Sequence, residues 1–125
     1  MTYPGDHLLH PVMPLRALLF LLLAAWVLPA AAAERIVAVG GAVTESVYAL
    51  GQGHRLVAID STSQYPAEAD ALPDVGYMRR LSAEPILALR PDLVLAIEGS
   101  GPPAVLEQLR RSGVPVETVP NEPTV

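Results

Sequence analysis

Residues 75–96 read VGYMRRLSAEPILALRPDLVLA, in the order of a loop, a short helix and an apolar strand. Ser82 is a favourable N-cap for this helix, and Pro85 falls in its first turn, where a missing N–H is tolerated. Pro91 disfavours the helical conformation of the residue before it and so ends the helix. The run LVLAI at 93–97 is the most hydrophobic stretch outside the amino-terminal third, which predicts a buried central strand.

Two further apolar runs precede this stretch and have the length of strands. Residues 35–39 (RIVAV) lead into Gly40-Gly41, where we expect a sharp turn, and residues 56–59 (LVAI) form the second run. The connection between them is long enough for a helical crossover, so the two strands can pair in parallel. The expected helix carries apolar residues at helical spacing and ends at a glycine: Val43, Val47, Leu50 and Gly51.

A second helix and a last strand follow the central run. Pro102 or Pro103 starts a helix that Gly113 closes, and residues 115–119 (PVETV) alternate as in a strand near a sheet edge. Strand, helix and strand thus recur with short connections. The sequence therefore predicts an α/β fold: a single Rossmann-like lobe with a mostly parallel sheet flanked by helices.

Residues 1–33 are interpreted as an N-terminal extension and a secretory signal peptide, with Met13 as a second start. Arg16 precedes an apolar run that ends in small residues, and cleavage after Ala32 or Ala33 fits this order. A membrane anchor is the alternative. The run is short of the roughly 20 apolar residues that a spanning helix needs, so we expect no stable membrane insertion after cleavage.

The composition excludes several classes of partner and site. The 125 residues include 13 acidic and 8 basic ones, for a net charge of −5, and no cysteine. Disulfides and thiolate metal sites are therefore excluded, and no basic face for nucleic acid is expected. An exported lobe without cysteine suits a Gram-negative periplasm, which is the predicted localisation.

The segments after the strands, where open parallel sheets bind ligands, offer little catalytic chemistry. Gly40-Gly41 stands between a strand and a helix, as in anion sites. Neither G-x-G-x-x-G nor Walker A is present, however, which favours a tight turn with close backbone approach. His54 lies in a short turn, and no serine has a nucleophile-elbow context. We therefore expect no enzyme and no catalytic cofactor.

Tyr77 follows a glycine in the predicted loop and has Arg79 and Arg80 close by. Phenolate oxygen is a hard anionic donor that suits ferric iron, and tyrosine is among the axial ligands of haem. Nearby arginines can pair with carboxylates of a ligand. A loop tyrosine is more often a packing or surface residue, and composition alone leaves that alternative open. Tyr48 is expected in the core, and Tyr65 in either setting.

Four segments carry a resemblance to a known family: VGGAVTESVYALG (39–51), Tyr65-Pro66, LPDVGYMRRLSAE (72–84) and ILALRPDLVLA (86–96). Through them, residues 35–123 resemble the N-terminal lobe of periplasmic haem-binding proteins of bacterial haem ABC importers. These proteins belong to a wider group that binds cobalamin, siderophores or haem. ALRPDLV is shared across the wider group and specifies architecture, whereas VGYMRRLSAE is the more haem-specific part.

This resemblance implies a site. Tyr77 is expected to be the axial ligand of ferric haem iron, and Arg79 to lie near the porphyrin or its propionates. Glu84 corresponds to a carboxylate that docks on arginines of the inner-membrane ABC permease, although acidic residues favour helix starts whatever the partner. Haem is expected as the transported ligand. The rest of the ligand pocket is expected to include Gly76, Gly40, Gly41 and Tyr65.

The resemblance covers one lobe of a two-lobed architecture. Residues 34–125 are thus predicted to be an incomplete N-terminal lobe, truncated before the spanning helix and the second lobe that supplies opposing haem contacts. Three alternatives stay open: a cobalamin or ferric-siderophore carrier of the same group, a non-functional truncated fragment, and part of an exported α/β enzyme.

Overall fold

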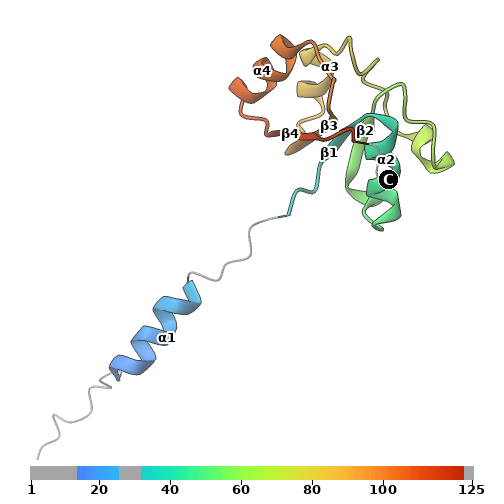
Figure 1. The fold of residues 1–125 in the computed structure, drawn as a ribbon. Coiled ribbons are helices and arrows are strands. Elements are labelled where there is room, and N and C mark those ends of the chain that lie inside the picture. The colour runs from blue at the N-terminus through green and yellow to red at the C-terminus, as the bar shows by residue number, and fades with distance from the viewer. Residues whose placement is uncertain (1–13, 26–31, 123–125) are drawn as a thin grey trace, which may run out of the picture. The chain divides into compact units, whose positions relative to one another are not determined.

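The computed structural model describes residues 14–25 and 32–122 of the chain. Contacts divide the chain into two units, Met1–Ala32 and Ala33–Val125, and the first contains helix α1 (Leu15–Ala25) (Figure 1). No helix in these described ranges is long and apolar enough to cross a membrane. Residues 1–13 and 26–31 lie outside the described residues, so the signal peptide stays a prediction.

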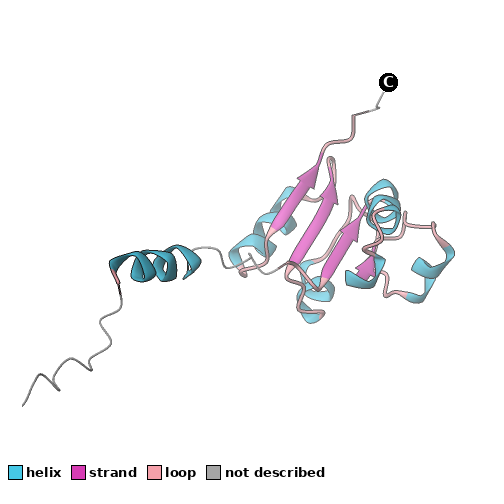
Figure 2. Cartoon of the chain, turned by 90° about the horizontal axis from the view of Figure 1, so that it is seen from below, coloured by secondary structure: helices cyan, strands magenta, loops and turns pink. Residues whose placement is uncertain are grey.

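A four-stranded parallel sheet in the order β2-β1-β3-β4 forms the centre of the second unit (Figure 2). The register between β1 and β3 runs from Ile36 opposite Leu93 to Val39 opposite Ala96. All pairings are parallel, with β3 in the interior and β4 at an edge. The predicted α/β class and strand positions are confirmed. The strands are β1 (Ile36–Val39), β2 (Leu56–Ile59), β3 (Leu93–Ile97) and β4 (Val116–Val119).

Helices cover both faces of this sheet. Helix α2 (Gly41–Ala49) connects β1 to β2, and helix α4 (Pro103–Arg111) connects β3 to β4. The two crossovers run in opposite directions from the centre of the sheet, so right-handed connections place their helices on opposite faces. Helix α3 (Ala83–Ala88) contacts α4, and Figure 1 shows these two helices together, away from α2.

Strand β1 is buried on both faces and joins two apolar cores. Val37 and Val39 belong to the core under α3 and α4, whereas Ile36 and Ala38 belong to the core under α2. All four side chains are at most 4% exposed. A strand between two helical layers has no solvated face, which explains why this run is continuously apolar rather than alternating.

The observed ends of the helices agree only in part with the stop and cap residues predicted from the sequence. Gly51 (φ +72°) follows α2 as the predicted stop, and Arg90, before a proline, has left the helical region (φ +50°). Leu50, expected on the packing side of α2, is instead 75% exposed because it is the C-cap residue. Ser82 occupies the N-cap of α3, but its side chain makes no capping hydrogen bond.

Asp92 ties the start of β1 to the start of β3. Its carboxylate accepts hydrogen bonds from the N–H groups of Glu34 (2.9 Å) and Arg35 (3.0 Å). The bond from Glu34 is the main reason why the pKa of Asp92 lies below its ordinary value, with a smaller opposing effect of desolvation. Arg35 also donates to the carbonyls of Leu89 and Arg90, just after α3. Arg35 and Asp92 together therefore connect the starts of β1 and β3 with the end of α3.

Candidate functional site

The loop at residues 75–81 runs along the rim formed by the carboxyl ends of the strands. Just after β2, the N–H of Ser61 donates to the carbonyl of Gly76 at 2.9 Å. In the turn after β3, the N–H of Gly101 donates to the carbonyl of Met78 at 2.8 Å. The loop therefore connects the ends of β2 and β3 and belongs to this rim.

Tyr77 is held in this loop by a backbone turn. Its carbonyl accepts a hydrogen bond from the N–H of Arg80 at 2.8 Å, and Gly76 before it has φ +100°. Val75 and Leu81, at the two ends of the loop, are buried in the core. Tyr77 itself remains 44% exposed. A phenol on an anchored turn is thus accessible to a ligand without rearrangement of the fold.

Arg79 and Arg80 are exposed on the same loop. Within residues 14–25 and 32–122, the one ion pair joins Arg110 to Glu107, so no described carboxylate neutralises either loop guanidinium. Arginine favours bidentate pairing with carboxylates. The loop therefore combines one oxygen donor for a metal with two cations that suit an anionic ligand.

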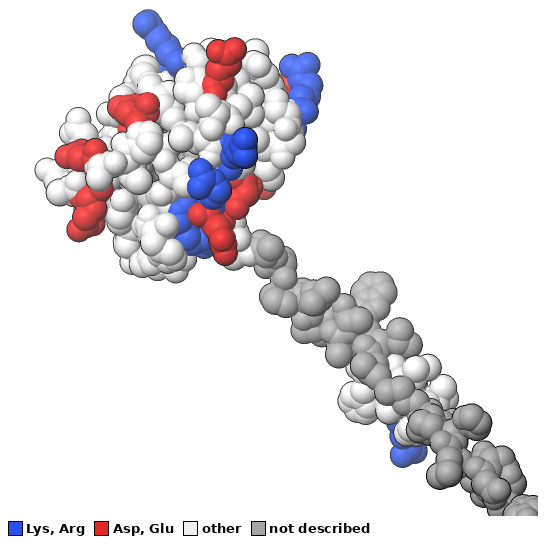
Figure 3. Space-filling view, turned by 180° about the vertical axis from the view of Figure 1, so that it is seen from behind, with Lys and Arg blue, Asp and Glu red and all other residues white. Residues whose placement is uncertain are grey.

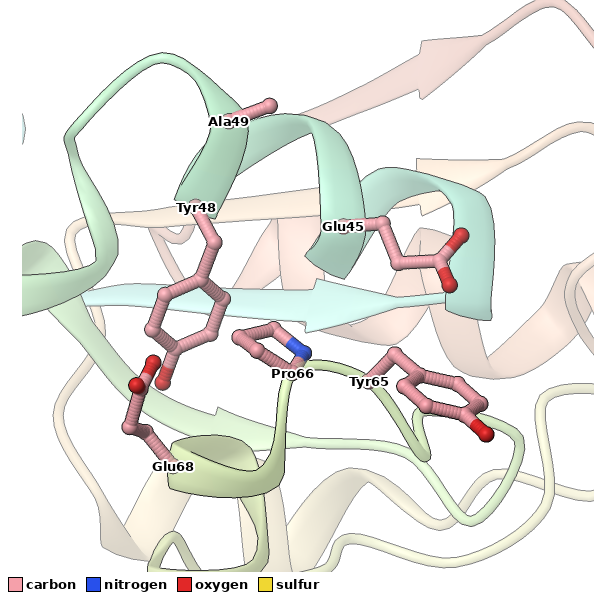
Figure 4. A pocket seen from close by; sticks show the side chains of 6 residues that line it. All are labelled: Glu45, Tyr48, Ala49, Tyr65, Pro66 and Glu68. Carbon is pink, nitrogen blue, oxygen red and sulfur yellow. The ribbon is translucent and has the colours of Figure 1, made fainter.

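Tyr65 lies on the surface, which resolves the choice that the sequence left open. It is 68% exposed and lines a shallow pocket beside α2 (Figure 4). Tyr48 lines the same pocket and is only half-buried, so it packs against the core under α2 rather than inside it as predicted. The cause is local: Tyr48 lies over Gly53, where a Cβ atom would collide with its ring, and this contact keeps the ring at the edge of the core.

Gly40 and Gly41 form the tight turn that the sequence favoured. Gly40 is buried with φ +104°, and a Cβ atom there would lie 2.5 Å from Cγ2 of Ile97. The N–H of Gly40 donates to Asp60 at 2.9 Å, and that of Gly41 donates to Oγ1 of Thr62 at 3.0 Å. Side chains of this chain therefore already use these two N–H groups at the start of α2. The predicted place of both glycines in a ligand pocket stays a prediction.

Asp60 is the centre of a buried polar network that the sequence reading missed. Its carboxylate is 0% exposed and accepts hydrogen bonds from Gly40 N–H, Thr62 N–H (3.2 Å), Thr62 Oγ1 (2.7 Å) and Ser63 Oγ (2.8 Å). Thr44, also fully buried, contacts Ser63 through a hydroxyl pair at 2.7 Å. The sequence signal for this network is the polar run that directly follows the apolar strand β2. An aspartate at that position can reach the end of the neighbouring strand β1.

Glu84 is the second residue of α3 and is exposed. An exposed carboxylate in the first turn of a helix is favourable without any partner. Its proposed contact with a permease therefore stays a prediction.

Other chemistry finds little support in the described residues. His54 is exposed, and no group of three His, Cys, Asp or Glu residues in the described part of the chain is arranged to hold a metal ion. On the face in Figure 3, acidic and basic side chains lie interspersed, without a continuous basic surface. Tyr77 and the two arginines near it remain the arrangement best suited to bind a ligand.

The lobe that carries Tyr77 is similar to proteins of known structure. Residues 36–125 match the family described as periplasmic binding protein. The structure of a periplasmic haem-binding protein from Pseudomonas aeruginosa is 48% identical, with a TM-score of 0.73, over 74% of this chain and 33% of that one. A vitamin B12-binding protein from Vibrio cholerae is 38% identical, with a TM-score of 0.64, over 69% and 34%.

A curated relative agrees with these structures. The vitamin B12-binding protein of Yersinia pseudotuberculosis is 43% identical over 101 residues, which are 81% of this chain and 36% of the relative. The chain thus spans about a third of the length of the relatives it matches. The resemblance to periplasmic haem-binding proteins is confirmed. Relatives named for haem and for vitamin B12 are both similar, so the ligand is not distinguished.

Proposed function

The chain belongs to the periplasmic binding protein family, and from this premise we propose that it is the N-terminal lobe of a periplasmic carrier for ferric haem. In this proposal Tyr77 coordinates the iron, and the carrier delivers haem to an inner-membrane ABC permease. The observation that carries it is the exposed phenol of Tyr77 on an anchored rim loop beside two arginines without an acidic partner among the described residues. Because the chain spans about a third of its relatives' length, delivery is assigned to the whole carrier.

The donor set supports haem as the cargo. Phenolate is a hard oxygen ligand for ferric iron, and it occurs as an axial ligand in haem proteins. Haem also carries propionates, which Arg79 can pair with. We assign Gly76, Tyr65, Gly40 and Gly41 to the wall of the surrounding pocket. Gly40 and Gly41 contribute to it by shaping the turn after β1. We assign no catalytic step to the lobe.

Cobalamin is the second candidate, because vitamin B12-binding proteins are among the similar relatives. The corrin ring carries amides where haem has free propionates, and its cobalt is already coordinated. Neither the phenol of Tyr77 nor the charge of Arg79 is then needed for binding. Substitutions of Tyr77 or Arg79 should therefore weaken binding of haem but leave binding of cobalamin unchanged.

The remaining assignments follow from the same proposal. Residues 1–33 serve as extension and signal peptide, residues 34–125 as the N-terminal lobe, and the carrier works in the periplasm. Glu84, exposed at the start of α3, is assigned to docking on the permease.

Absorption spectroscopy tests the iron ligand. Ferric haem is titrated into the protein and into Tyr77→Phe, and the Soret and charge-transfer bands are recorded. We expect the bands of tyrosinate ligation in the unsubstituted protein and their loss in Tyr77→Phe. Tyr48→Phe, which removes a phenol oxygen elsewhere on the lobe, should retain them. An unchanged spectrum in Tyr77→Phe would overturn the assignment, and thermal stabilisation by cyanocobalamin but not by haem would favour the second candidate.

A further inference from the structure

The shallow pocket beside α2 has side chains of a different chemistry from those of the Tyr77 loop. It has a volume of about 540 Å³ and is lined by two tyrosines, a proline and two glutamates together with one alanine. Figure 4 shows Pro66 between the rings of Tyr48 and Tyr65. The carboxylate of Glu68 lies by the hydroxyl end of Tyr48, and Glu45 extends above Tyr65 on the other side. The floor is thus largely aromatic, with a carboxylate near each end.

The negative charge of this pocket is not compensated within the described part of the chain. No arginine or lysine lines it, and the one ion pair among the described residues lies on α4, between Glu107 and Arg110. Neither Glu45 nor Glu68 makes a side-chain hydrogen bond to a described protein group closer than 3.5 Å. Both carboxylates therefore remain available to a cation from outside the lobe.

The rings are suited to the same kind of ligand. Tyr48 is half-buried, and its burial, together with the nearby charge of Glu68, raises the pKa of its phenol. A tyrosine phenol is neutral at physiological pH even without this shift. Neutral aromatic rings attract a cation over their faces, best for organic cations that are easily desolvated. An anionic ligand such as haem is disfavoured here by both glutamates.

We propose that the pocket formed by Glu45, Tyr48, Tyr65, Pro66 and Glu68 binds a small organic cation of the alkylammonium class. The rings of Tyr48 and Tyr65 contact the apolar surface of the cation, and the two carboxylates neutralise its charge. Tyr77 does not line this pocket, and Tyr65 is the one residue that it shares with the pocket wall assigned to haem.

Tetramethylammonium chloride is a direct probe, with tert-butanol as the neutral compound of similar shape and sodium chloride to match ionic strength. The full chain is titrated and followed by backbone amide chemical shifts. We expect saturable shifts at residues 45–49 and at residues 65, 67 and 68 with tetramethylammonium, and none of comparable size with tert-butanol. Equal shifts with both compounds, or shifts that rise linearly without saturation, would contradict the proposal.

Substitutions distinguish specific binding in this pocket from a general effect of negative surface charge. Glu45→Gln and Glu68→Gln should each weaken tetramethylammonium binding roughly two- to fivefold. Tyr65→Leu should weaken it by a similar factor, whereas Tyr65→Phe should retain it, because the ring face and not the hydroxyl is used. Glu117→Gln makes the same charge change at an exposed position on β4 and should leave binding unchanged.

Two outcomes of this comparison overturn the proposal. The first is a loss in Glu117→Gln equal to that in Glu45→Gln, which would indicate screening alone. The second is unchanged binding in both pocket glutamate variants. Tyr77→Phe should bind tetramethylammonium like the unsubstituted protein, so failure of the haem proposal and failure of this one are distinguishable.

Discussion

The buried carboxylate of Asp60 accepts a hydrogen bond of 2.9 Å from the backbone N–H of Gly40, and this bond joins the ends of two neighbouring strands. Gly40 follows β1 and Asp60 follows β2, so the bond fixes the start of α2 against the segment that leads to Tyr65. A polar network around Asp60 therefore holds this part of the rim in addition to apolar packing.

Asp60→Ala should destabilise the lobe by about 3 kcal/mol or more, because it leaves several buried donors without an acceptor. Asp60→Asn keeps the shape and one acceptor oxygen, so it should have a smaller effect. Urea denaturation measures both changes. Asp70→Asn, at an exposed position, is the control and should change stability by less than about 0.5 kcal/mol. A loss below about 1 kcal/mol in Asp60→Ala would show that the network is dispensable.

Gly40→Ala should be more destabilising than Gly99→Ala. Both positions have positive φ, which costs a residue with a side chain about 1–2 kcal/mol. Only at Gly40 does the added Cβ atom meet a neighbour, Ile97, so overpacking adds roughly 1–3 kcal/mol. Thermal unfolding of the two variants isolates this packing contribution. Equal losses would show that Ile97 can move aside.

Asp92→Asn should remove a pH-dependent part of the stability. The folded-state pKa of Asp92 is lowered, mainly by the hydrogen bond from Glu34 N–H. The ionised group therefore stabilises the lobe fully above its ordinary value of 3.8, and this contribution is lost as pH falls through the lowered value. We expect a gap in urea midpoint between the protein and Asp92→Asn at pH 6 that closes in strong acid. A gap independent of pH would be inconsistent with this role.

Arg79→Gln should weaken haem binding roughly two- to fivefold, because an exposed arginine contributes modestly to pairing with a propionate. Haem dimethyl ester lacks the free carboxylates and should bind equally to Arg79→Gln and to the unsubstituted protein. Absorption titrations with both ligands provide the measurement. Arg111→Gln on α4 is the matched control. If Arg79→Gln weakens binding of haem and of its ester alike, the arginine acts through the loop and not through the propionates.

The strands and helices were predictable because their signals are local. Three apolar runs, the alternating run at 115–119, the glycines after helices and the prolines at helix starts placed the four strands and helices α2, α3 and α4 within about two residues of their observed bounds. The errors occurred where a residue's burial depends on where its helix ends and on how the next turn packs against that helix. Leu50 has the spacing of a core residue yet lies exposed at a helix end, and Tyr48 stops at the edge of the core because it lies over Gly53.

The sequence by itself determined the α/β architecture, the tight turn at Gly40-Gly41 and the choice of Tyr77 as the residue of interest. The first two follow from periodicity and backbone restrictions, which are properties of neighbouring residues, whereas the choice of Tyr77 follows from the resemblance of VGYMRRLSAE to haem-binding proteins. Only the tertiary structure decided that the loop of Tyr77 is bonded to the ends of β2 and β3, that Asp60 holds Gly40, and that Tyr48 and Tyr65 share a pocket with two glutamates. Hydrogen bonds and pockets join residues far apart in the chain, and no local pattern specifies which distant groups meet.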